Sequence, residues 1–124
     1  MAITISGSLT ISGSFASGTD IITDELVLYI DAANKRSYPG SGTTVYNLAN
    51  RNVTGTLVNG TAFSSNNKGY FDLDGTNDYI EFGDNDIYTF GDSSDDSAFS
   101  VSAWVYMDDA TPFTILEKFF NYAG

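Results

Sequence analysis

The stretch GYFDLDGTNDYIEF, residues 69–82, predicts two short β-strands joined by a tight polar turn. In each run apolar side chains recur at every second position, as period-two strands require: Phe71 and Leu73, then Ile80 and Phe82. The residues between them, DGTND, tolerate positive φ or bond to their own backbone, so they can reverse the chain. We therefore expect a β-hairpin that packs one apolar face on a core.

The composition is that of a single all-β domain. At 124 residues the chain has room for one modest core. Hydrophobic residues make up 42%, and they occur in runs shorter than a core helix needs, separated by Gly, Ser, Thr, Asn and Asp. This pattern favours antiparallel strands over helices.

Charge and residue types exclude several functions. Sixteen acidic residues against five basic ones give a formal net charge of −11, which would repel a phosphate backbone, so we expect no nucleic-acid partner. The absence of Cys and His excludes thiol catalysis, disulfides, Ser-His-Asp chemistry and the commonest zinc ligands. Only carboxylates remain for acid–base chemistry or metal binding.

Residues 1–23 predict an extended N-terminal arm and linker. Thr-Ile-Ser-Gly-Ser occurs at residues 4–8 and again at residues 10–14. A segment so rich in Gly and Ser cannot bury enough area to order itself, so it is either a disordered leader or a docking arm that adds strands to a neighbour. It lacks the basic start and continuous apolar middle of a signal peptide, and no run reaches the roughly 18 apolar residues of a membrane span. We therefore expect synthesis in a cytoplasm and no membrane insertion.

Further strands are expected after the arm, at residues 26–30, 43–48, 54–63 around Asn59-Gly60, 99–107 and 113–120. Residues 84–96, the most acidic part, predict a solvated loop. The longest candidate is FSVSAWVYM, residues 99–107, with Val, Ala and Val on one face and Ser, Trp and Tyr on the other. It holds the only Trp, Trp104, for which a core position is expected and a sugar-binding platform is the alternative.

Three pieces of the chain together resemble laminin-G-like, concanavalin-A-like domains: VLYIDAANKRSYPGSGTT at 27–44, FDLDGTNDYIEF at 71–82 and FSVSAWVYM at 99–107. The last two match the family's Phe-x-x-Asp-Gly-x-x-Asp-Tyr hairpin and its Ser-x-Ser-Ala-Trp-Val strand. The first resembles a version often found in tail, fibre and other virion proteins of tailed bacteriophages. There the following loop usually carries Trp and Asp, where this chain has Val45 and Asn47.

The resemblance implies an antiparallel β-sandwich, a laminin-G-like jelly roll, over residues 24–124. It covers only the first half of such a domain, so the jelly roll is apparently incomplete at the C-terminus. We expect the chain to be a fragment of a longer protein. The alternative is that neighbouring subunits complete the sandwich by strand addition.

For function, the resemblance implies a non-enzymatic structural protein of a bacteriophage virion, in the tail, a fibre or the capsid surface. Its jelly roll would make assembly contacts or bind host-surface glycans. Residues 1–16 would join other virion proteins, and a homotrimer is the first expectation. The alternatives are a secreted bacterial adhesin or carbohydrate-binding module, and a fragment of a carbohydrate-active enzyme.

Catalysis is not expected. Glycosidases need two carboxylates held across a cleft. The three Glu residues, Glu25, Glu81 and Glu117, are far apart in the sequence, and none sits in the Glu-x-Asp-x-Glu pattern of the β-glucanases that share this fold.

Asp74, Asn77 and Asp78 are candidate calcium ligands. The resemblance implies an ion in a rim loop, and these side chains offer the hard oxygen donors that calcium prefers. Their spacing does not match an EF-hand loop, and Asp74-Gly75 can equally form a turn with a capping carboxylate. A calcium site and a plain turn therefore remain alternatives, and no other cofactor is expected.

Overall fold

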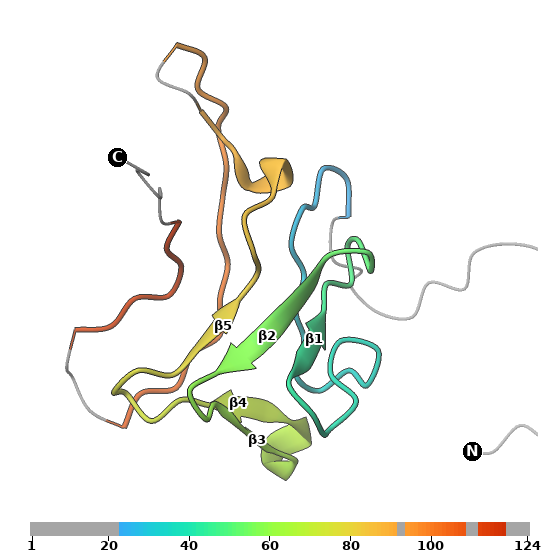
Figure 1. Cartoon of the computed structure of the whole chain (residues 1–124), viewed down its shortest axis with the longest axis vertical. Coiled ribbons are helices and arrows are strands. Elements are labelled where there is room, and N and C mark those ends of the chain that lie inside the picture. The colour runs from blue at the N-terminus through green and yellow to red at the C-terminus, as the bar shows by residue number, and fades with distance from the viewer. Residues whose placement is uncertain (1–22, 92–93, 109–111, 119–124) are drawn as a thin grey trace, which may run out of the picture.

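The structure, a computed structural model, describes residues 23–91, 94–108 and 112–118. These residues form two small antiparallel sheets and two short 3-10 helices (Figure 1). The expected all-β class is confirmed. The arm expected over residues 1–23 lies outside the described residues, apart from Thr23. No helix in the described ranges is both long and apolar enough to cross a membrane.

The larger sheet has three strands in the order β1-β2-β5: β1 (Thr44–Tyr46), β2 (Thr54–Val58) and β5 (Tyr79–Glu81). Both pairings are antiparallel, with Val45 opposite Gly55 and Leu57 opposite Ile80. Inward and outward positions alternate along β2, as the period-two pattern requires.

The smaller sheet pairs β3 (Ala62–Ser64) with β4 (Tyr70–Asp72), and the 3-10 helix η1 (Asn66–Lys68) connects them. Phe63 lies directly opposite Phe71. Figure 1 shows this sheet at one end of the three-stranded sheet.

The hairpin expected over residues 69–82 is wrong in its pairing. Both strands form, but β4 pairs with β3 and β5 pairs with β2. The polar residues 73–78 therefore carry the chain from one sheet to the other.

The Asn59-Gly60 turn is confirmed, although it too joins strands of different sheets. Its φ angles are 59° and 108°, and the Thr61 N–H donates to the Val58 carbonyl at 3.3 Å. Positive φ at both central positions is typical of a type I′ turn, which Asn-Gly favours. The turn leads from β2 into β3, so it is a second crossing between the sheets.

The core lies where side chains of both sheets meet. Its buried hydrophobic residues are Tyr38, Val45 and Leu57, packed against the partly buried Ile30, Phe63, Phe71, Ile80 and Phe82. The Tyr38 ring packs on the smaller sheet, with its centroid 5.0 Å from that of Phe63 and 5.2 Å from that of Phe71, and clusters with Val45 and Leu57 of the larger sheet. Such tilted and edge-on aromatic contacts stabilise beyond the area they bury.

Residues 26–30 do not pair as a regular strand, although a continuous strand was expected there. They are held to the end of β1 by one backbone bond, from Leu48 N–H to the Tyr29 carbonyl at 2.8 Å, and by the Asn47 side chain. Val45 and Asn47 are both fully buried. Both positions are therefore structural in this chain.

The two strands expected nearest the C-terminus are not formed among the described residues. Residues 99–107 and the described part of 113–120, residues 113–118, pair with neither sheet. Before them, the acidic residues 84–96 hold the 3-10 helix η2 (Asp86–Tyr88) and an isolated bridge between Gly91 and Asp96. The Asp side chains described in this stretch are exposed, as expected.

Candidate functional site

Residues 99–107, called here the unpaired segment, begin at a point that is fixed by contacts with Phe90. Just before it, the Ser97 N–H donates to the Phe90 carbonyl at 2.7 Å. The Phe99 ring then stacks on the Phe90 ring, with centroids 4.7 Å apart and an angle of 18° between the planes. From there to Met107 the backbone runs without a turn or bend (Figure 1). No backbone hydrogen bond joins it to any other part of the chain that the structure describes.

The side chains of the unpaired segment are exposed although most are apolar. Trp104 is 101% exposed and Tyr106 is 91% exposed, and Val101 and Val105 are exposed by more than half. The expectation of a core position for Trp104 is thus wrong in this structure. Exposed apolar side chains concentrated in one segment are typical of an interaction site, and an extended segment with unpaired backbone groups is a template for pairing with another chain.

Residues 112–118 also expose apolar side chains. Phe113, Ile115 and Leu116 are each at least half exposed. Lys118 ties the end of the segment back to η2, because its Nζ donates to the Tyr88 carbonyl at 3.1 Å and to Thr89 Oγ1 at 2.9 Å. The two exposed segments are therefore anchored at opposite ends, around Phe90 and around Tyr88.

The three candidate calcium ligands lie in the loop between β4 and β5, where the carboxylates of Asp74 and Asp78 accept hydrogen bonds from the loop's own backbone and the Asn77 carbonyl accepts from Asn59 Nδ2 at 2.7 Å. Asp74 Oδ1 accepts from the N–H groups of Thr76 and Asn77, at 2.8 and 3.4 Å. Asp78 Oδ2 accepts from the Asp74 N–H at 3.1 Å. These are the contacts of a turn capped by carboxylates.

One oxygen in this loop has no partner. Asp78 Oδ1 is buried and makes no hydrogen bond. Yet the described residues contain no group of three or more His, Cys, Asp or Glu that could hold a metal ion. The geometry supports the plain turn, and calcium binding stays a prediction.

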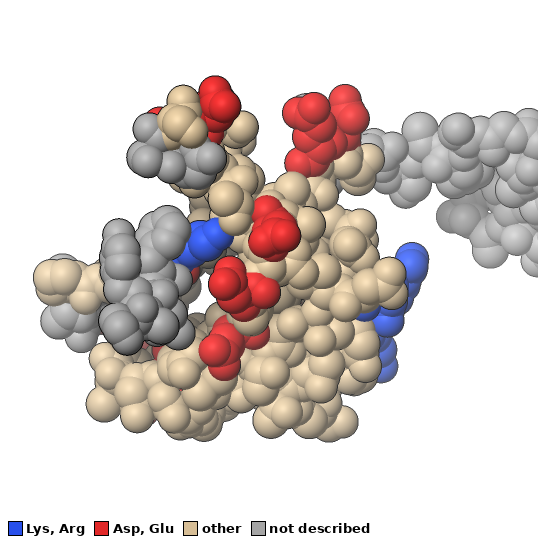
Figure 2. Space-filling model, turned by 45° about the horizontal axis from the view of Figure 1, so that its top comes forward, with Lys and Arg blue, Asp and Glu red and all other residues tan. Residues whose placement is uncertain are grey.

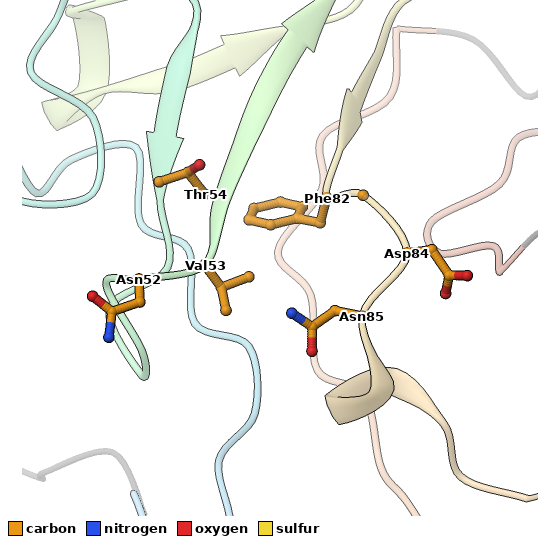
Figure 3. A pocket seen from close by; sticks show the side chains of 7 residues that line it. Asn52, Val53, Thr54, Phe82, Asp84 and Asn85 are labelled. Atoms are coloured by element: carbon orange, nitrogen blue, oxygen red, sulfur yellow. The ribbon is translucent and has the colours of Figure 1, made fainter.

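A shallow hollow of about 220 Å³ lies between the β1–β2 connection and the residues after β5; Asn52, Val53, Thr54, Phe82, Gly83, Asp84 and Asn85 line it. Figure 3 shows the Phe82 ring turned toward β2, whereas the Asp84 carboxylate points away from the hollow. Asn85 Oδ1 is already engaged, since it caps η2 by accepting from the Ile87 N–H at 3.1 Å. The lining therefore offers no carboxylate aimed at a ligand.

Tyr88 carries the one resolved pKa shift among the described residues. Its ring is partly covered while its hydroxyl oxygen is buried. Burial raises the pKa of the hydroxyl above its usual value of 10.0, and the nearby Asn47 side chain, the smaller effect, lowers it. The contact with Asn47 falls short of hydrogen-bond geometry, so the hydroxyl stays unsatisfied.

The three Glu residues lie on different parts of the chain: Glu81 on β5, Glu25 before residues 26–30, and Glu117 in residues 112–118. No protein-family model, curated protein or solved structure matches this chain. The laminin-G-like resemblance therefore rests on the sequence motifs themselves.

Proposed function

We propose that this chain is a non-enzymatic structural protein of a tailed-bacteriophage virion, a component of the tail, a fibre or the capsid surface. Its antiparallel sheets belong to a laminin-G-like jelly roll whose remaining strands come from the rest of a longer protein or from neighbouring chains. The observation that carries the proposal is the unpaired segment, whose backbone groups have no partner among the described residues and whose apolar side chains are exposed.

The physical argument is strand addition. An extended segment with free N–H and C=O groups gains a full set of main-chain bonds when a neighbouring chain lies beside it, and its apolar side chains leave water at the same time. In a particle, the neighbouring subunits lie close enough to provide such a chain. The arm expected over residues 1–16 would add a second contact of the same kind, and a homotrimer would provide identical partners.

Incorporation into particles tests this proposal. Val101→Asp/Val105→Asp places two charges on the apolar face of the unpaired segment and should exclude the chain from purified particles. Asn50→Asp/Asn52→Asp adds the same charge at two exposed positions of the β1–β2 connection and should be incorporated normally. Equal incorporation of both variants would contradict a role of the unpaired segment in assembly.

Residues 1–16 call for a separate deletion. Without them the sheets should fold unchanged, as judged by circular dichroism, while incorporation is lost. Normal incorporation of the deletion variant would show the arm to be a passive leader.

A second candidate function, host-glycan binding, is favoured by one observation. Trp104 and Tyr106 are two residues apart, so in an extended segment they project from the same face, and both are more than 90% exposed. Flat aromatic faces of this kind can stack on the apolar faces of sugar rings. Because Trp104 is the only Trp, its fluorescence reports the site directly: host-surface polysaccharide should shift it in the wild type, and much less in Tyr106→Ala.

A further inference from the structure

We propose that residues 99–107 pair with the same residues of a second copy of this chain, antiparallel and centred on Ala103. The two copies would then share a two-stranded β-ribbon. This names the partner at the unpaired segment, and it rests on the proposed function in taking that segment to be a contact site.

The sequence of the unpaired segment is complementary to itself in this register. On one face the pairs are all apolar: Phe99 with Met107, Val101 with Val105, and Ala103 with Ala103. On the other face each aromatic residue lies opposite a serine: Ser100 with Tyr106, and Ser102 with Trp104. Directly opposed residues of antiparallel strands share a face, so each large ring would find a small neighbour and each aliphatic side chain an aliphatic one.

Charge favours this register over the neighbouring ones and places the contact where two copies would repel each other least. The chain carries a net charge of −11, and Asp and Glu side chains gather on the face shown in Figure 2. Two copies would repel each other over such a surface, whereas residues 99–107 carry no charge. Centred on Ala103, the ribbon sets Asp108 across from Ala98. Moving the centre to Ser102 would set Asp108 across from Asp96, and an in-register parallel pair would set Asp108 beside Asp108.

Pairing would break no contact that the structure shows. The described residues give the backbone of the unpaired segment no hydrogen bond to lose, and its largest side chains are in water. The contact is also self-limiting, because an antiparallel pair of identical strands has a two-fold axis and closes at two copies. It therefore differs from the three-fold contact expected of the arm.

Single introduced cysteines in the full chain test the register, because the chain has no cysteine of its own. At Ala103 the two thiols would face each other across the axis, with Cα atoms roughly 4.5–5.5 Å apart, within the range of roughly 4.4–6.8 Å that a disulfide spans. At Val101 the two thiols would be offset by four residues, roughly 13 Å, which is too far. Under mild oxidation Ala103→Cys should give at least about tenfold more disulfide-linked dimer than Val101→Cys, since only the first meets disulfide geometry.

Two further tests keep the result decisive. Val101→Cys/Val105→Cys should cross-link as well as Ala103→Cys. Val101→Lys and Val105→Glu should each elute as monomers, and mixing them should restore a dimer, because the introduced lysine of one copy would then face the introduced glutamate of the other. Equal cross-linking of Ala103→Cys and Val101→Cys, or none with either, would overturn the pairing.

The other occupants of the segment give distinct results. Residues 112–118 folding back on it would leave a monomer that does not cross-link, and a glycan would shift Trp104 fluorescence without producing a dimer. Both results overturn the inference. The proposed function can fail independently of the pairing. If the chain forms cross-linked dimers but is absent from particles, the pairing holds and the proposed function is contradicted. If the chain is incorporated into particles but does not cross-link, only the pairing is contradicted.

Discussion

The side-chain amide of Asn47 takes the place of a strand partner for Tyr29. Its Oδ1 accepts from the Tyr29 N–H at 3.0 Å, and its Nδ2 donates to the Val27 carbonyl at 2.8 Å. The same Oδ1 also accepts from the Ala49 N–H at 2.9 Å. One fully buried side chain therefore supplies hydrogen bonds to the chain that leads into the domain and to the turn after β1.

Replacing Asn47 with Ala should destabilise the domain by about 1–3 kcal/mol, because three backbone groups at partly buried hydrogen bonds lose their partner. Urea denaturation followed by circular dichroism measures this. Asn50→Ala is the control, since Asn50 is exposed and its side chain accepts only from the Asn52 N–H at 3.1 Å. A loss at Asn47 no larger than the loss at Asn50 would contradict this role.

The sequence could predict this part of the fold only incompletely. The apolar run at residues 26–30 predicts a strand that does not form, although Ile30 packs against the core, whereas Asn59-Gly60 correctly indicates a turn. Periodicity reports which face of a strand is apolar but not which strand lies beside it. This is why β4 and β5 were expected to pair: the polar residues 73–78 look like a hairpin turn, and they also suffice to cross between sheets.

The ring of Phe82 leaves no room for a side chain at Gly55. A Cβ atom at Gly55 would lie 2.7 Å from a carbon of that ring. Gly55→Ala should therefore cost about 1–3 kcal/mol in the free energy of unfolding through overpacking. In a Phe82→Leu background the cost should shrink, which a double-mutant cycle measures.

Gly83→Ala is the matched control, because a Cβ atom there would have no neighbour within 4 Å. It should change stability by no more than about 0.5 kcal/mol, as surface substitutions usually do. The same cost for Gly55→Ala in both Phe82 backgrounds would show that the ring is not the obstacle.

Tyr88 should make stability fall at alkaline pH. Burial raises the pKa of its hydroxyl in the folded chain above the value of 10.0, so above pH 10.0 the unfolded chain releases this proton first. The stabilisation is fully present below pH 10.0 and is lost as the pH rises through the folded-state pKa. Tyr88→Phe should remove this part of the decline, as urea denaturation at a series of pH values would show.

The control for Tyr88 is Tyr106→Phe, because the Tyr106 side chain is 91% exposed and its hydroxyl stays in water. That variant should keep the wild-type decline. Tyr88→Phe should also cost little at neutral pH, since the lost hydroxyl has no hydrogen bond. Parallel pH profiles of the wild type and Tyr88→Phe would refute the assignment.

The position of Trp104 shows why the candidate site was only partly predictable. Alternation over residues 99–107 predicts a strand with one apolar face, and a lone strand Trp is more often buried than exposed, but the described residues form no strand there and all of these side chains are exposed. Burial, however, needs a partner strand, and a sequence pattern does not reveal whether the described sheets supply one.

Chelation separates the two interpretations of Asp74, Asn77 and Asp78. If calcium binds their oxygens, a chelator should lower the melting temperature of the wild type. At a free calcium concentration 100 times the dissociation constant, binding would add about 2.7 kcal/mol of stability, which is large enough to detect. An ion would stabilise the buried Asp78 Oδ1 more than the other oxygens, because this oxygen has no hydrogen bond.

Two substitutions at Asp78 distinguish ion binding from turn capping. Asp78→Ala removes both, so it should lower the melting temperature and abolish any effect of chelator. Asp78→Asn keeps an oxygen that can accept from the Asp74 N–H but removes the charge that calcium needs. A calcium site predicts that Asp78→Asn, too, becomes insensitive to chelator. A plain turn predicts near-wild-type stability for Asp78→Asn and no chelator effect in the wild type, Asp78→Ala or Asp78→Asn. Because the backbone already occupies Asp74 Oδ1 and Asp78 Oδ2, the second pattern is the one the loop geometry favours.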